Sequence, residues 1–326
     1  MPRSWERLSA ISLVLLPLTL VFLILSAVRR LIFRIGILNA TKIHVPVIVV
    51  GNITVGGTGK TPIVVAIANA LKDSGLAPGI ITRGYRGDGT NREVVETSTP
   101  SEVGDEPILI FNKVKCPVWV GPNRSRSAQQ IIKKYPNVNV IISDDGLQHY
   151  ALKRDIEVVV IDGERKFGNS LLLPSGPLRE SISRIQTCDL AVINGPQIHK
   201  LPIPTTNMKL IGSTFHKLSD PTITCDAEDL LKTEVTAIAG IGNPERFFQH
   251  LKSLGLRPKT IRFPDHHRYS VKDFNSIEND IIIMTEKDAV KCKSYAPKEC
   301  WFLPVTAEFN GPFIQTIIEK LKNYHG

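Results

Sequence analysis

The sequence predicts an α/β fold: a parallel sheet with helices on both faces, a second, smaller α/β domain, and an N-terminal membrane helix. Three observations support this prediction. Short β-branched runs alternate with helix-like stretches, a pattern typical of a parallel sheet covered by helices. A glycine-rich loop joins the first of these runs to a helix-like stretch. A long uncharged apolar run lies near the N-terminus.

Size and composition are those of a folded globular protein. The 326 residues allow about two domains of roughly 150 residues each. Hydrophobic residues make up 42% and charged residues 22%, which excludes collagen-like, low-complexity and wholly disordered chains. The five cysteines form an odd set without a CxxC pair, which argues against a disulfide framework and a zinc site and favours a reducing compartment.

The net charge of +9 suits an anionic membrane surface or a phosphorylated substrate as well as nucleic acid. The sequence contains no basic run interleaved with aromatic residues, so we do not predict nucleic-acid binding.

The N-terminal segment, residues 1–35, is predicted to anchor the chain to a membrane. No charged residue occurs from Leu8 to Val28, and as a helix this run would extend about 31 Å, close to the hydrocarbon thickness of a bilayer. Pro17 is a possible kink. The arginines that follow the run place the rest of the chain in the cytoplasm. A cleaved signal peptide, a buried helix and a helix lying in the interface are the alternatives.

Strand-like runs divide the remaining chain into two α/β domains. The first, residues 36–195, has its runs at Val45–Val50, Gly79–Thr82, Val118–Val120, Val138–Ile142, Glu157–Ile161 and Leu190–Ile193. Residues 196–234 are Pro-rich and irregular, which predicts a linker or connecting strands. The second domain, residues 235–326, has its runs at Val235–Ala239, Thr260–Phe263, Ile281–Met284 and Trp301–Val305, with helices beginning near Pro244, Val271 and Gly311.

A phosphate-binding loop is the strongest chemical signal. The string Gly51-Asn-Ile-Thr-Val-Gly-Gly-Thr-Gly-Lys60-Thr61 lies between an apolar strand and the helical stretch 62–72. Backbone N–H groups of such a loop point at phosphate oxygens, and its lysine reaches the terminal phosphates. The motif is a variant P-loop because Thr54 replaces the first glycine, so the larger domain is predicted to be P-loop NTPase-like. The predicted nucleotide-binding residues are Thr54, Val55, Gly56, Gly57, Thr58, Gly59, Lys60 and Thr61.

A P-loop site also needs a carboxylate at the end of a neighbouring strand, and the sequence offers one. The apolar run from Val138 ends at Asp144 and Asp145, which resembles a Walker B strand. Carboxylates at this position hold Mg²⁺ directly or through water, and Thr61 would supply a hydroxyl ligand. An acidic loop tip is the alternative.

Short polar motifs follow most of the predicted strands, and in a parallel sheet they would face one crevice. They include Thr82–Arg86, Gly104–Pro107, Gly121–Arg124, Gln148–His149, Gly176–Glu180, Asp265–His267 and Thr285–Asp288. A guanine-reading Asn-Lys-x-Asp string is missing from the sequence, which disfavours GTP. His266 and His267 have no further His or Cys nearby at the spacing of a zinc site, so a structural metal is not predicted.

The order of motifs resembles that of the tetraacyldisaccharide 4′-kinases, the lipid A 4′-kinases of Gram-negative bacteria. The motifs are GNITVGGTGKTP, ITRGY, VGDEP, GPNR, SDDGLQH, LLPSGPLRE, AGIGNPERFF, FPDHHRY and TEKDAVK, and they cover nearly the whole chain. The resemblance implies transfer of the ATP γ-phosphate to the 4′-hydroxyl of a tetraacyldisaccharide 1-phosphate, at the cytoplasmic face of the inner membrane.

The resemblance also implies roles for the individual residues that match the family's motifs. Asp105 and His266 would form a pair from different domains in which the aspartate takes the proton of the sugar hydroxyl, while Lys60 and Mg²⁺ stabilise charge. The implied metal-side residues are Thr61, Glu106, Asp144 and Asp145. The acceptor-side candidates are Tyr85, Arg124, His149 and Arg179. His267 is treated as an onlooker.

The implied partners are ATP, Mg²⁺, a membrane-embedded glycolipid and the bilayer itself, with no obligate protein partner. Two alternatives stay open from the residues alone. One is a kinase for another membrane lipid or a polyprenol alcohol, and the other is a membrane-tethered nucleotide switch.

Overall fold

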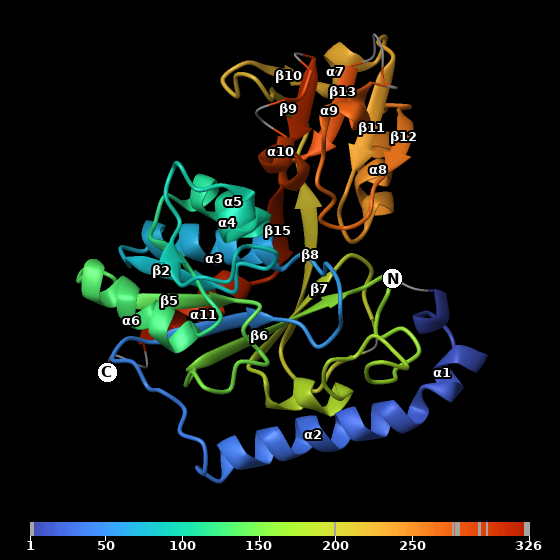
Figure 1. The fold of residues 1–326 in the computed structure, drawn as a ribbon. Coiled ribbons are helices and arrows are strands. Elements are labelled where there is room, and N and C mark those ends of the chain that lie inside the picture. The colour runs from blue at the N-terminus through green and yellow to red at the C-terminus, as the bar shows by residue number, and fades with distance from the viewer. Residues whose placement is uncertain are drawn as a thin grey trace.

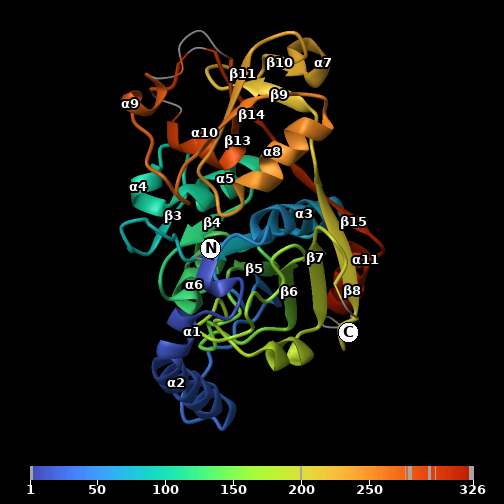
Figure 2. The same cartoon turned by 90° about the vertical axis from the view of Figure 1, so that its right-hand side faces the viewer.

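The computed structural model describes residues 3–322 apart from 199, 276, 278–280, 293, 294 and 298. Two lobes, each built on its own sheet, lie one above the other, and a long helix runs along the base of the larger lobe (Figure 1). Seen from the side, the helices of the smaller lobe lie over the helices of the larger one (Figure 2). The chain is therefore a two-domain α/β protein with an appended N-terminal helix.

The larger domain is built on a nine-stranded sheet of order β15-β8-β7-β6-β1-β5-β2-β4-β3. The seven strands from β8 to β4 are parallel, and the edge strands β15 and β3 are antiparallel to their neighbours. The bounds are β1 (Val47–Gly51), β2 (Pro78–Thr82), β3 (Arg92–Glu93), β4 (Val118–Val120), β5 (Val140–Asp144), β6 (Ile156–Asp162), β7 (Leu190–Asn194), β8 (Thr205–Ile211) and β15 (Thr306–Asn310).

Helices cover both faces of this sheet. The bounds are α3 (Lys60–Asp73), α4 (Pro100–Val103), α5 (Asp105–Val114), α6 (Arg124–Lys134), the 3₁₀ helix η2 (Ile182–Thr187) and α11 (Phe313–Lys322). Apolar residues of α3, α5 and α11 form one core with the sheet, and those of α6 and η2 form the other. The central strands β1, β6 and β7 are buried on both faces and contain the apolar runs 47–50, 158–161 and 190–193.

The smaller domain has a six-stranded sheet of order β10-β9-β14-β13-β11-β12. Its strands are β9 (Thr214–Lys217), β10 (Thr224–Asp226), β11 (Val235–Ala239), β12 (Lys259–Arg262), β13 (Ile281–Thr285) and β14 (Cys300–Leu303). Its helices are α7 (Ala227–Leu230), α8 (Pro244–Ser253), α9 (Val271–Phe274) and α10 (Glu286–Cys292). Two apolar clusters, one on each side of the sheet, form its core.

Every strand predicted from sequence is present, with ends within two residues of those expected. The stretch 196–234, expected to be a linker or connecting strands, contains β8, β9 and β10. The C-terminal boundary differs from the prediction. Strand β15 pairs with β8 in the larger sheet, and α11 packs in the core of the larger domain, so residues 306–322 do not belong to the smaller lobe. The reason is apolar complementarity, because Phe313, Ile317 and Leu321 bury one helical face against α3 and the sheet.

The smaller lobe is therefore inserted between β8 and β15. The chain enters it at Gly212 and leaves it at Val305. These connections touch, since a Cβ at Gly212 would lie 2.3 Å from the carbonyl oxygen of Pro304. A side chain at this position would force the two connections apart.

The N-terminal segment forms η1 (Arg3–Trp5), α1 (Ala10–Val14) and α2 (Leu16–Arg34). The helix breaks at Leu15, and Pro17 lies in the first turn of α2, where a missing N–H costs nothing. By length and composition α2 is long and apolar enough to cross a membrane. Its small polar Thr19 is buried against the larger domain, with Oγ1 2.7 Å from Oγ of Ser175, whereas its Leu, Ile and Val side chains are mostly exposed.

We predict that Phe313→Ala destabilises the larger domain by about 3–5 kcal/mol, because the ring is 1% exposed and its removal leaves a cavity. Urea unfolding followed by Trp119 fluorescence checks this, with Trp5 and Trp301 replaced by phenylalanine in every protein compared. Val271→Ala, at an exposed site of the smaller domain, should change stability by less than about 0.5 kcal/mol. An unchanged Trp119 transition in Phe313→Ala would place α11 outside this cooperative unit.

Candidate active site

The phosphate loop joins β1 to α3 at the carboxyl edge of the larger sheet, the edge that faces the smaller lobe. Gly59 caps α3 with a φ of 90°, and a Cβ there would lie 2.4 Å from Nδ2 of Asn194. That amide nitrogen donates to the carbonyl oxygen of Thr58 at 3.0 Å. Only glycine fits this position, and the first N–H groups of α3 are left facing the cavity.

The two ends of the loop have different surroundings. Residues 57–61 line a cavity of about 400 Å³ between the lobes, whereas Thr54, Val55 and Gly56 are not among its lining residues. The Val55 N–H donates to the carbonyl oxygen of Pro177 at 2.8 Å, and Thr54 forms a β-bridge with Leu178. The first part of the loop thus anchors to the LLPSGPLRE segment, and the second part, where the anion cradle is predicted, lines the cavity.

Lys60 lies at the centre of a compact charge cluster. Its Nζ is 3.4 Å from Oδ1 of Asp145 and 3.3 Å from Oδ1 of Asn52. Arg179 contacts both carboxylate oxygens of Asp145, at 3.1 and 3.0 Å. Burial alone would raise the pKa of Asp145, but Lys60 and Arg179 outweigh it and hold that pKa below its usual range. Asp145 is therefore an ionised counter-charge for two cations.

Asp144, the adjacent residue at the end of β5, differs from Asp145 in its hydrogen bonding and in the direction of its pKa shift. It is 1% exposed, and its Oδ1 has no hydrogen-bond partner among the described residues. Burial and the nearby Glu106 raise the pKa of Asp144 to about 7. A buried carboxylate with an unpartnered oxygen, within electrostatic reach of Lys60 and Glu106, is suited to a cation.

The predicted metal-side residues only partly converge. Thr61 and Glu106 line the cavity, and Asp144 lies within electrostatic reach of Glu106. Among the described residues, no group of three or more His, Cys, Asp or Glu side chains is close enough to hold a metal ion by itself. The donor set fits Mg²⁺, which takes few protein ligands and completes its shell with water and phosphate oxygens. Asp145, occupied by Lys60 and Arg179, is less suited to direct coordination.

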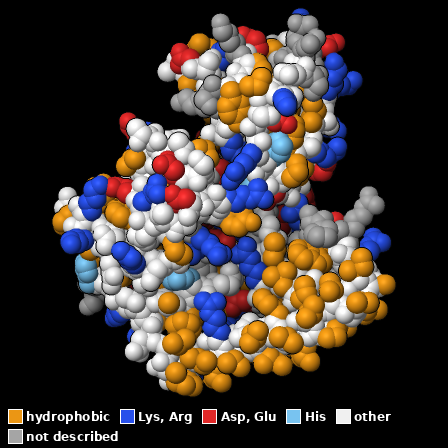
Figure 3. All heavy atoms as spheres, in the orientation of Figure 1, with side chains coloured by type: hydrophobic (Ala, Val, Ile, Leu, Met, Phe, Trp, Pro, Cys, Tyr) orange, Lys and Arg blue, Asp and Glu red, His pale blue; other side chains and the backbone are white. Residues whose placement is uncertain are grey.

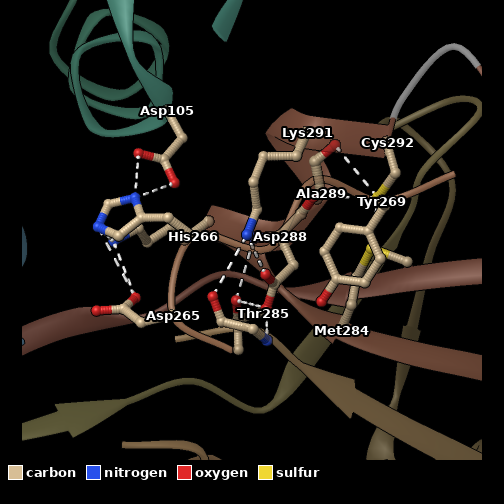
Figure 4. Close-up of polar contacts among 12 residues, drawn as sticks. Asp105, Asp265, His266, Tyr269, Met284, Thr285, Asp288, Ala289, Lys291 and Cys292 are labelled. Atoms are coloured by element: carbon tan, nitrogen blue, oxygen red, sulfur yellow. Dashed lines mark hydrogen bonds and ion pairs between the residues drawn. The ribbon is translucent and has the colours of Figure 1, made fainter. Parts of the chain in front are cut away.

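The structure brings Asp105 and His266 together across the two lobes. Nδ1 of His266 lies 3.0 and 2.9 Å from the two carboxylate oxygens of Asp105 (Figure 4). Asp105 begins α5 and is 5% exposed. Burial alone would raise the pKa of Asp105, but the His266 hydrogen bond and the charge of Lys287 hold it below the usual value.

The loop that carries His266 is held in place by its backbone. The residue has a φ of 58°, its N–H donates to the Gly240 carbonyl oxygen at 3.1 Å, and its own carbonyl oxygen accepts from Arg86 at 2.7 Å. Gly240 in turn donates its N–H to the fully buried Asp288 at 3.1 Å. His267 points elsewhere, stacking on Phe263 with ring centroids 4.5 Å apart.

Lys287 is a site residue to which sequence reasoning gave no role. Its Nζ lies 2.9 Å from Oε1 of Glu106 and 3.2 Å from Nε2 of His266. Burial alone would lower the pKa of Lys287, but Glu106, Asp105 and Asp265 outweigh it and raise that pKa. The motif TEKDAVK contains this lysine, but nothing in the neighbouring sequence indicates that a single lysine on a short helix contacts residues of another domain.

Part of the remaining cavity wall is apolar. Its wall includes Val65 and Leu109 from the larger domain and Ile241, Phe247 and Leu303 from the smaller one. An apolar wall beyond a phosphate cradle suits a nucleoside base.

The acceptor-side candidates fall into two groups. Tyr85 is 54% exposed and packs edge-on against His266, with ring centroids 5.2 Å apart. Arg124 and Arg179 both contact Asp145, through its backbone carbonyl and its carboxylate respectively. His149 lies within electrostatic reach of Arg124, and its Nε2 has no partner among the described residues. Lysine and arginine side chains gather along the hollow between the lobes in Figure 3.

The sheet and the loop between β1 and α3 place this chain among the P-loop nucleotide-binding enzymes. Comparison with known proteins narrows the class. The chain belongs to the tetraacyldisaccharide-1-P 4′-kinase family, whose model matches residues 11–322.

Individual relatives match nearly from end to end. A tetraacyldisaccharide 4′-kinase of Methylobacillus flagellatus is 46% identical over 323 residues, covering 98% of this chain and 95% of the relative. One of Shewanella sediminis is 44% identical over 325 residues, covering 97% and 92%. The crystal structure of LpxK from Aquifex aeolicus in complex with ATP matches with a TM-score of 0.81 at 28% identity, covering 95% of this chain and 99% of that one.

The environment of His149 generates a pH prediction. Burial, together with the charges of Arg124, Arg154 and Arg29, lowers the pKa of His149 to about 4. The unfolded chain protonates this residue near pH 6.5, so its contribution to stability is present above that pH and is lost as pH falls toward 4. Between pH 7 and 4.5 the wild type should lose about 1 kcal/mol more than His149→Gln, allowing for partial exposure. Urea titrations at each pH give the free energy of unfolding of both proteins. An equal change with pH in the two proteins would contradict the prediction.

Proposed function

We propose that the cavity between the lobes binds ATP and that Asp105, oriented by His266, takes the proton of the acceptor hydroxyl during phosphoryl transfer. As a member of its family, the chain is a kinase that transfers the ATP γ-phosphate to the 4′-hydroxyl of tetraacyldisaccharide 1-phosphate in lipid A biosynthesis. The observation that carries the residue assignment is the Asp105–His266 contact, which adjoins the cavity through Glu106 and Lys287, two of its lining residues.

The nucleotide would lie with its phosphates on residues 57–61 and its base in the apolar part of the cavity. Lys60, already directed at the anion cradle by Asn52 and Asp145, would reach the terminal phosphates. The Thr58 hydroxyl supports this placement, since it is buried beside the cavity without a partner among the described residues.

Thr61, Glu106 and Asp144 would hold Mg²⁺. When bound, the ion neutralises charge on the phosphates, as in other phosphoryl transfers. Glu106 carries an ion pair with Lys287 at 2.9 Å, so its carboxylate is already directed into the cavity.

Asp105 has the geometry of a general base. Its carboxylate accepts from His266 Nδ1, which fixes its orientation and leaves lone pairs for the acceptor hydroxyl. As the hydroxyl oxygen bonds to the γ-phosphorus, its proton passes to Asp105 and the bond to the ADP leaving group breaks. The low pKa of Asp105 suits a loose transition state, in which the hydroxyl loses its proton late.

The lipid acceptor explains the N-terminal helix. Exposed apolar side chains gather over α1 and α2 in Figure 3, and α2 lies along the base of the larger domain. One side of α2 is packed on protein through Thr19, so lipid cannot surround it on all sides. We therefore propose that α2 lies in the interface of the inner membrane, with both lobes on the cytoplasmic side.

The test is an assay of purified, detergent-solubilised protein with γ-labelled ATP, Mg²⁺ and tetraacyldisaccharide 1-phosphate. Label should enter the lipid and fail to do so without Mg²⁺ or in Lys60→Ala. ATP hydrolysis without labelled lipid would contradict this acceptor and direct the search to other membrane alcohols.

We predict that Asp105→Ala lowers kcat by at least about 10²-fold, the effect typical of a lost general base, with ATP affinity near that of the wild type. Steady-state turnover and equilibrium ATP binding provide the two readouts. Asp73→Ala, which removes an exposed carboxylate at the end of α3, should keep full turnover. Full activity in Asp105→Ala would overturn the assignment of the base.

The exposed face of α2 should control membrane binding. Val21 and Leu25 are 53% and 64% exposed and lie one turn apart. Replacing both with glutamate should weaken binding to anionic lipid vesicles by about 10²-fold, since two apolar side chains no longer enter the interface. Ile223→Glu, at an exposed apolar site of the smaller lobe, is the control and should leave vesicle sedimentation unchanged. Unchanged sedimentation of the double variant would place the membrane contact elsewhere.

A further inference from the structure

Lys287 is delivered to the active site from the smaller lobe. It lies in the first turn of α10, and its side chain is 17% exposed. Its ammonium nitrogen contacts three groups: Glu106 at 2.9 Å, His266 Nε2 at 3.2 Å and Asp265 at 3.8 Å. The lysine therefore connects the loop that carries His266 with the larger domain.

The contact between Lys287 and His266 has only one consistent hydrogen-bond assignment. An ammonium group has three N–H donors and no acceptor. At 3.2 Å it must donate to Nε2, which requires that Nε2 carry a lone pair and no proton. The ring proton of neutral His266 then lies on Nδ1, the nitrogen that faces Asp105 at 2.9 Å.

The place of the ring does not depend on this lysine. The His266 backbone is bonded to Gly240 and Arg86, and Tyr85 packs against the ring. The Gly240 N–H in turn donates to the carboxylate of Asp288. Loss of Lys287 would thus leave the ring in position and change where its proton is found.

We propose that Lys287 is a positioning residue that fixes His266 in the Nδ1–H tautomer and thereby keeps the Asp105 carboxylate oriented as the proton acceptor. This proposal rests on the proposed role of Asp105 and His266 and assigns the group that prepares them. The other tautomer would present a bare Nδ1 lone pair to the carboxylate, which repels it instead of orienting it.

The first test reads the tautomer without reference to turnover. The full chain in detergent, labelled with ¹⁵N-histidine, gives ring nitrogen shifts that separate protonated from bare nitrogens. His266→Gln identifies the His266 signals. We expect a protonated Nδ1 and a bare Nε2 in the wild type, and a proton population on Nε2 in Lys287→Met. A protonated Nε2 in the wild type, or an unchanged His266 spectrum in Lys287→Met, would overturn the proposal.

Lys113→Met is the matched control. Lys113 also joins the lobes, through Glu286 at 2.7 Å, but it makes no contact with His266. Its loss should leave the His266 nitrogen shifts as in the wild type. A change equal to that in Lys287→Met would mean that the spectrum reports contact between the lobes and not the lysine itself.

A double-mutant cycle shows whether Lys287 acts through the histidine. Lys287→Met should lower kcat by about 10-fold or more in the wild type and by less than about 2-fold in His266→Gln. Lys287→Arg, which keeps a cation that only donates, should restore most of the wild-type kcat. An equal loss in both backgrounds would contradict action through His266, while Asp105→Ala tests the base separately.

Discussion

The hydrogen bond between Asp105 and His266 is the contact on which the proposed active site depends, because its two partners belong to different lobes and lie 161 positions apart in the chain. Other contacts hold the lobes at the distance this bond requires. Arg246 reaches Asp162 at 2.9 Å, Asn243 reaches Glu164 at 3.0 Å, and Lys113 pairs with Glu286 at 2.7 Å. Cross-lobe contacts thus flank the phosphate cavity, and a shift between the lobes would separate the pair before it disturbed either core.

Two adjacent aspartates show how surroundings divide the chemistry of one motif. Asp145 lies in a turn with a φ of 49° and is neutralised by Lys60 and Arg179. Asp144 ends a buried strand, and burial raises its pKa. One carboxylate is satisfied by the protein, and the other keeps an oxygen without a partner among the described residues. The same residue type therefore serves as a structural counter-charge at one position and as a candidate ligand at the next.

The sequence was most informative where local pattern and burial agree. The central strands and the phosphate loop could be predicted because apolar runs, glycines and a Lys-Thr pair occur in order. The outer strands β8 and β15 could not be predicted, since their residues are mostly half-exposed or exposed and show no continuous apolar run. Asp105 and His266 came from resemblance alone, as no spacing rule joins residues so far apart. Lys287 had no signal, because its role exists only when two lobes meet.

The insertion of the smaller lobe between β8 and β15 also sets the order in which the protein is made. The helix α2 leaves the ribosome before the phosphate loop. The last strand and last described helix of the larger domain, β15 and α11, come only after the whole smaller lobe. Until then β8 has an open edge, and the core lacks Phe313, Ile317 and Leu321. The larger domain therefore cannot close until β15 and α11 have been made, so the sheet that carries the phosphate loop is completed only after the smaller lobe.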